Sequence, residues 1–143
     1  MESVYGDRLH SKEMGRRDSL ENIVEDTVHA GGTLMIPAFA LERTQDILYD
    51  LDALVSEGRV PSVPFFVDSP LAIKATSIYK KYPEYYSFDV QREIQGGDAM
   101  FQFSGLVFTQ TVEESKHINE EPPPKVIIAG SGMSQGGRIL HHE

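Results

Sequence analysis

A glycine-rich run near the C-terminus, GSGMSQGGR at residues 130–138, has the composition of an anion-binding loop. It directly follows the apolar stretch KVIIA, which is typical of a strand. Glycines let backbone N–H groups approach a negatively charged oxygen, Ser131 and Ser134 add neutral donors, and Arg138 adds a positive charge. We therefore predict a phosphate-binding loop. Its assigned residues are Ser131, Gly132, Met133, Ser134, Gly136, Gly137 and Arg138.

Two other expected strands end in polar residues that suit the same ligand. IPAFALERTQ supplies Arg43 and Gln45 just beyond one strand, and VDSPLA places Asp68 and Ser69 at the end of another. In open parallel sheets, ligands bind beyond the carboxyl ends of the strands, where loops and helix N-termini meet. We expect Arg43 and Gln45 to contact phosphate, and Asp68 and Ser69 to line the same cleft.

Structural explanations compete with these assignments. The glycines would equally serve a tight turn, and Asp68 would equally cap a helix or a turn. An arginine in the position of Arg43 is more often a solvated helix charge than a ligand contact, unless its neighbours converge on it. A dinucleotide-binding fingerprint would need glycine at Gln135, and a Walker loop would need Lys followed by Ser or Thr, so neither motif fits. The five histidines have no spacing typical of a metal site. We expect no metal in this chain.

The elements that would position these residues alternate along the chain. Short apolar runs at 32–39, 63–69, 105–110 and 125–131 are bounded by Gly, Pro or Ser, as is typical of strands buried on both faces. Between them, SLENIVEDTVHAG, ERTQDILYDLDALVSEG and SPLAIKATSIYKKY have the apolar spacing or the capping residues of helices. This order predicts an α/β domain with a mostly parallel sheet flanked by helices.

Composition restricts the class of protein. A chain of 143 residues is long enough for one core and too short for two. The formal net charge of −9 argues against a general nucleic-acid binder, although basic spots can lie on an acidic body. The sequence contains no cysteine, which fits a cytoplasmic protein. No apolar run approaches the ~20 residues of a membrane span, so we expect no membrane contact.

Four motifs, in this order, resemble the β-CASP region of metallo-β-lactamase-fold ribonucleases: ESVYGDRLH, PAFALERTQDILYDL, FFVDSPLAIKATSIY and GSGMSQGGRILHH. The resemblance covers essentially residues 1–143. That family includes the endonuclease of pre-mRNA 3′-end cleavage and RNA-processing exonucleases, so the resemblance implies RNA as partner and phosphodiester hydrolysis as activity. It also implies a catalytic role for Glu2, the acidic residue of the family's motif A. Val4 stands where the family usually has threonine.

The resemblance also implies a second domain. Family members bind two zinc ions through H-x-H-x-D-H and further ligands of the lactamase domain, and these ions generate the attacking hydroxide. The present sequence contains no H-x-H-x-D-H. We expect a β-CASP domain excised from a larger enzyme, with Met1 an added start residue. The lactamase domain of the same polypeptide would be its partner and hold the zinc, the chain alone would be inactive, and the full-length enzyme could form a homodimer.

Two other functions fit parts of the sequence. The chain could be a free-standing α/β module that binds a small phosphorylated ligand, because the glycine loop would serve that ligand equally well. The aromatic run YKKYPEYYSF could instead contact a protein partner, or its rings could be half-buried core residues. Endonuclease and exonuclease action are both compatible with the motifs.

Overall fold

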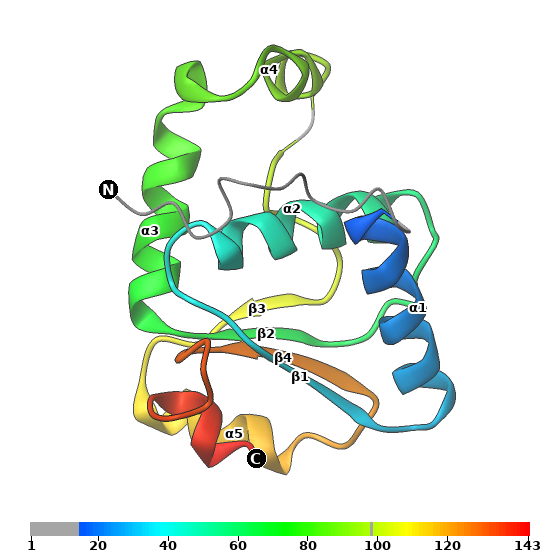
Figure 1. Cartoon of the computed structure of the whole chain (residues 1–143), viewed down its shortest axis with the longest axis vertical. Coiled ribbons are helices and arrows are strands. Elements are labelled where there is room, and N and C mark those ends of the chain that lie inside the picture. Colours follow the sequence, from blue (N-terminus) through cyan, green and yellow to red (C-terminus); the bar gives the residue numbers. More distant parts are fainter. Residues whose placement is uncertain (1–14, 98) are drawn as a thin grey trace, which may run out of the picture.

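The computed structural model describes residues 15–97 and 99–143, which form an α/β domain (Figure 1). Within these residues one sheet holds four parallel strands in the order β1-β4-β2-β3. The predicted fold class is confirmed. The strands are β1 (Thr33–Pro37), β2 (Phe65–Asp68), β3 (Leu106–Phe108) and β4 (Lys125–Ala129). The helices are α1 (Arg16–His29), α2 (Arg43–Ser56), α3 (Pro70–Lys81), α4 (Phe88–Gln95) and α5 (Val112–Glu120), with short 3-10 turns η1 (Pro83–Tyr85) and η2 (Arg138–His141).

The two central strands, β2 and β4, are buried along their whole length, which explains their continuous apolar character. Helices α1 and α2 cover one face of the sheet, and α5 and η2 cover the other (Figure 1). Alternate side chains serve the two cores: Phe65 packs toward α1 and α2, and its neighbour Phe66 packs with Ile118 of α5 and Ile139 of η2. No helix among the described residues is long and apolar enough to cross a membrane.

Several helix ends lie where the sequence predicts them. The Ser69 hydroxyl accepts a hydrogen bond from the backbone N–H of Ala72 at 3.3 Å, and Pro70 is the first residue of α3, so the predicted N-cap is confirmed. Gly31 and Gly58 follow α1 and α2 with φ angles of 64° and 69°, the left-handed conformation that closes a helix without a steric penalty.

Strand register brings three carboxyl ends to one level. Pro37 of β1 pairs with Ala129 of β4, and Asp68 of β2 pairs with the same Ala129 from the other side. The loop after β1 stays attached to β4, because the N–H of Ala38 donates to the carbonyl of Ala129 at 3.0 Å. The loops after β1, β2 and β4 therefore meet at a single edge of the sheet.

Lys125, the first residue of β4, is a buried cation that closes the C-terminus of α5. Its Nζ donates to the carbonyl oxygens of Ile118 at 2.5 Å and Glu121 at 2.7 Å. A positive charge is favourable there, because the last carbonyls of a helix lack partners and carry partial negative charge.

Lys125→Met keeps the apolar stem of the side chain and removes its donors. We expect the free energy of unfolding to fall by about 1–2 kcal/mol, because two buried carbonyls lose their partner. Urea denaturation followed by circular dichroism measures the change. Lys116→Met, at an exposed position on the same helix, is the control and should stay within about 0.5 kcal/mol of wild type. Equal losses in both variants would contradict the capping role.

Candidate functional site

A pocket of about 510 Å³ lies where the three loops meet at the carboxyl edge of the sheet. Its volume is within the range of roughly 300–1,000 Å³ found for small-ligand sites. Five of the residues predicted from sequence contribute to its wall, and the loop after β1 contributes the rest of one side. The predicted residues in the wall are Asp68, Ser69, Ser131, Gly137 and Arg138, and the side from β1 is residues 38–40.

The glycine loop is closed by its own backbone. The N–H of Ser131 donates to the carbonyl of Gly136 at 2.9 Å, and the N–H of Ile139 donates to the carbonyl of Gly130 at 2.8 Å. Gly137 has φ 78°, and a Cβ there would collide with the carbonyl oxygen of Gly130. Gly137 is therefore required by the tight turn itself, which is the structural explanation offered for the glycines.

Other parts of the loop leave room and donors for a ligand. An added Cβ at Gly136 would meet open space, whereas one at Gly132 would lie only 3.0 Å from the backbone nitrogen of Phe39, so the room is at Gly136. Within the described part of the chain, no hydrogen bond occupies the N–H groups of Gly132, Met133 and Gly136. The loop therefore combines a rigid closure with unused donors, which suits an anionic oxygen.

Asp68 is fully buried at the end of β2 and accepts four side-chain hydrogen bonds. Its Oδ1 accepts from Thr109 Oγ1 at 2.8 Å and from Arg138 Nη1 at 2.5 Å. Its Oδ2 accepts from Ser115 Oγ at 2.6 Å and lies 2.9 Å from His142 Nε2. We call these five residues the Asp68 cluster. Its members come from β2, the ends of β3 and η2, α5 and the C-terminal residues, so it joins separate segments at one carboxylate.

The hydrogen bonds keep Asp68 ionised. Burial alone raises the pKa of Asp68, but donation from Ser115, His142, Arg138 and Thr109 outweighs it and holds that pKa below its ordinary value. The His142 ring is fixed from its other side, where Nδ1 lies 2.7 Å from Asn119 Oδ1. Asn119 in turn donates to the carbonyl of His141 at 3.1 Å.

Arg138 lines the pocket, but its charge is directed at Asp68. Besides that ion pair, Nη2 donates to the carbonyl of Gln110 at 3.1 Å. The sequence assigned this guanidinium to phosphate, and the structure shows that it first compensates a buried carboxylate. A phosphate contact by Arg138 stays a prediction. The ion pair with Asp68 already neutralises part of the positive charge that such a contact would use.

Gln45 does not line the pocket; it lies behind the pocket wall, buried between α2 and α3. It is 3% exposed, and its Nε2 donates to Thr76 Oγ1 at 2.9 Å and to the carbonyl of Ala40 at 3.2 Å. Phosphate contact by Gln45 finds no support in this geometry, because a ligand would have to separate the two helices to reach the amide.

The remaining predicted residues differ in their availability. Arg43 is exposed at the start of α2, directly after the pocket loop, and no carboxylate pairs with it among the described residues. Met133 is 65% exposed, and Ser134 adopts φ 46° within the loop. Glu2 lies outside the described residues, so its catalytic role stays a prediction.

Sequence reasoning missed Thr109, Ser115 and His142 as members of the site. In the sequence His142 is one of five histidines without the spacing of a metal site, and the two hydroxyl residues belong to no motif. A signal existed in VDSP, because an aspartate that ends a fully apolar strand needs partners once it is buried. Those partners lie 41 to 74 residues further along the chain, so spacing could not identify them.

The fold and the pocket define an α/β domain with a ligand-sized site at the carboxyl edge of its parallel sheet. The Beta-Casp domain family matches residues 44–143, and the chain belongs to that family. This confirms the resemblance found in the sequence motifs.

Named relatives agree with the family assignment. The chain is 42% identical over 142 residues to Ribonuclease TTHA0252 of Thermus thermophilus, which covers 99% of this chain and 32% of that protein. It is 33% identical over 124 residues to Transcription termination factor FttA of Methanosarcina mazei, covering 86% of this chain and 19% of the factor. It is 28% identical over 142 residues to Endoribonuclease YSH1 of Saccharomyces cerevisiae, covering 96% of this chain and 18% of the endoribonuclease. The chain thus spans a third or less of the length of these relatives.

Asp68→Asn should lower the free energy of unfolding at neutral pH by about 3 kcal/mol. The substitution leaves the buried side of Arg138 without its counter-charge, and breaking a buried pair from one side is costly. Urea denaturation measures the loss. Asp46→Asn is the matched control, because that half-exposed carboxylate pairs with Arg16 at 3.0 Å on the surface and should cost less than about 1 kcal/mol.

The pH dependence of the free energy of unfolding of wild type and Asp68→Asn tests the direction of the pKa shift of Asp68. Because the folded-state pKa of Asp68 lies below the unfolded value of about 3.9, its stabilising contribution is complete above that value and is lost as pH falls through the folded pKa. Wild type should therefore lose more stability than Asp68→Asn between about pH 5 and pH 2. Parallel curves for the two proteins would refute the shift.

Proposed function

We propose that this chain is the RNA-binding β-CASP part of a zinc-dependent metallo-β-lactamase-fold ribonuclease that hydrolyses RNA phosphodiester bonds. The observation that carries the proposal is the sheet-edge pocket, which is lined by Ser131, Gly137 and Arg138 of the glycine loop and by the loop after β1. Arg43, which is exposed, begins the helix that follows this second loop. The family match and the ribonucleases among the relatives supply the substrate class.

The donors at this edge would bind the RNA backbone. N–H groups, serine hydroxyls and an arginine recognise phosphate oxygens, and contacts of this kind position a nucleic acid without reading its sequence. The chain's part in the reaction is to hold and orient the phosphate chain against the hydrolytic centre. Binding by the chain alone should be weak, because its net charge of −9 repels a polyanion.

The proposed zinc does not fit the described residues. Among residues 15–97 and 99–143, no group of three or more His, Asp or Glu side chains lies together as metal ligands do. We therefore derive no step through a metal held by these residues, and assign zinc to a metallo-β-lactamase domain of the same polypeptide. When bound there, the ions would supply a hydroxide nucleophile. Glu2 is the residue of this chain that we propose to act closest to that reaction.

Arg43→Ala tests the phosphate assignment without disturbing the Asp68 cluster, which Arg138→Ala would break. We expect it to weaken binding of two unrelated single-stranded RNAs to a similar extent, and to reduce the dependence of log affinity on log salt by about one charge. Fluorescence anisotropy at two salt concentrations measures both effects, with Lys116→Ala as the exposed-cation control. An effect on only one RNA would contradict backbone binding. RNA-independent binding of a small phosphorylated compound would favour the free-standing module.

Gly132→Val tests the glycine loop itself. A side chain at this position would press on Phe39, whose backbone nitrogen lies 3.0 Å from the added Cβ and whose ring lies 3.1 Å from it. We expect RNA affinity to fall more than in Arg43→Ala, because the loop or Phe39 must move at the pocket wall. Gly32→Ala is the control, since its Cβ would make ordinary contacts at 3.6 Å far from the pocket. Unchanged RNA affinity in Gly132→Val would remove the loop from the binding site.

A further inference from the structure

Helix α3 is unusual in charge for this acidic chain. It carries Lys74, Lys80 and Lys81, and of the α-helices that the structure describes it alone contains no Asp or Glu. Lys80 is engaged, because its Nζ donates to the carbonyl of Phe101 at 3.2 Å. Lys74 and Lys81 are exposed. A local excess of positive charge therefore lies on a body of net charge −9.

One exposed face of α3 joins two pockets. Leu71, Lys74, Ile78 and Lys81 follow each other at spacings of three and four residues, which places them on one side of a helix. Leu71 lines the sheet-edge pocket, and Ile78 lines a second pocket at the far end of the helix. Figure 1 shows α3 leading from the carboxyl edge of the sheet toward α4, and η1 follows α3 in the chain.

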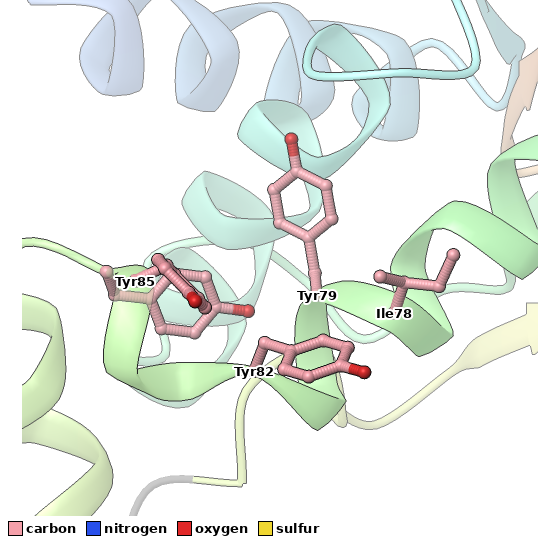
Figure 2. Close-up of a pocket in the computed structure, with 5 residues that line it drawn as sticks. Ile78, Tyr79, Tyr82 and Tyr85 are labelled. Atoms are coloured by element: carbon pink, nitrogen blue, oxygen red, sulfur yellow. The ribbon is translucent and has the colours of Figure 1, made fainter.

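The second pocket, which we call the tyrosine pocket, has a volume of about 510 Å³. Figure 2 shows Ile78 and Tyr79 on the helix and Tyr82 and Tyr85 at the turn that follows it. Tyr85 is 82% exposed, and Lys81 Nζ lies 5.5 Å from the centre of the Tyr82 ring. The hydroxyl of Tyr86, which also lines the pocket, is buried without a hydrogen-bond partner among the described residues. Exposed ring faces thus lie beside a cation and an unused polar group.

We propose that α3 guides single-stranded RNA from the sheet-edge pocket to the tyrosine pocket, where a base stacks on the ring of Tyr85. Lys74 and Lys81 would contact the phosphates between the two pockets. This inference rests on the proposed function and adds a second, remote subsite to it. The 12 residues of α3 span about 18 Å, so an RNA of roughly five or more nucleotides at a stacked spacing of ~3.4 Å would reach from one pocket to the other.

The lysines beside the rings favour RNA over a protein partner. Aromatic platforms beside lysines are the arrangement that binds single strands without sequence preference, because every base has a stacking face. Lysine is depleted from protein–protein interfaces. Glu84 is exposed near the tyrosine pocket, so stacking rather than net charge must supply the binding at that end.

Tyr85→Trp provides a direct reporter, because the chain contains no tryptophan. We expect its fluorescence to be quenched by a single-stranded RNA long enough to span α3. A dinucleotide that fills only the sheet-edge pocket should leave it unchanged. Quenching of equal size by both, or by neither, overturns the stacking assignment.

Affinities of the full 143-residue chain separate the inference from the proposed function. Tyr85→Ala should weaken the long RNA about ten-fold and the dinucleotide not at all, and Tyr85→Phe should retain wild-type affinity because the ring is kept. Lys74→Ala should also weaken the long RNA, whereas Lys116→Ala on α5 should not. If Arg43→Ala weakens binding and these α3 variants do not, the inference fails and the proposed function stands.

Two further results would also overturn the inference. Absence of RNA binding by wild type would overturn both proposals. If Tyr85→Ala instead abolishes self-association in analytical ultracentrifugation while RNA affinity is unchanged, the tyrosine pocket is a contact between copies of this chain.

Discussion

The buried carboxylate of Asp68 holds the functional edge of the domain together. A charge at the end of a fully apolar strand is costly unless it is compensated, and the chain compensates it with four side chains from outside β2. Two of these side chains lie at or after the end of the glycine loop: Arg138 is its last residue, and His142 follows it. The position of the loop relative to the sheet therefore depends on an electrostatic anchor.

Periodicity and capping chemistry allow much of the fold to be predicted from sequence. The runs FFVD and KVIIA are strands because they are buried on both faces, and Ser69 and Pro70 start α3 as their chemistry requires. The loop at 130–138 does lie at the carboxyl edge of a parallel sheet. These features depend on residues that are neighbours in the sequence, which is why local patterns reveal them.

The parts of the site that sequence could not give depend on distant partners. From the sequence Arg138 is expected to be a free cation, because its ion-pair partner Asp68 lies 70 residues earlier in the chain. In the structure the two side chains are paired. From the sequence Gln45 is expected to contact phosphate beyond the end of a strand, but the packing of α2 against α3 buries its side chain. Arg43 keeps its predicted availability because no carboxylate among the described residues lies against it. The same residue types thus divide into structural and ligand-facing groups according to tertiary contacts.

The two hydrophobic cores, one on each face of the sheet, differ in size, and the smaller one should open more readily. In the described chain, fourteen buried apolar residues pack around α1 and α2, and five pack beneath α5 and η2. The smaller core is therefore the better candidate for partial unfolding. In such an opening, η2 and the glycine loop detach while the larger core stays folded. A ligand held by that loop would stabilise the closed state, so occupancy and local amide exchange protection would rise together. Ligand binding would then be coupled to the local stability of η2 and the glycine loop.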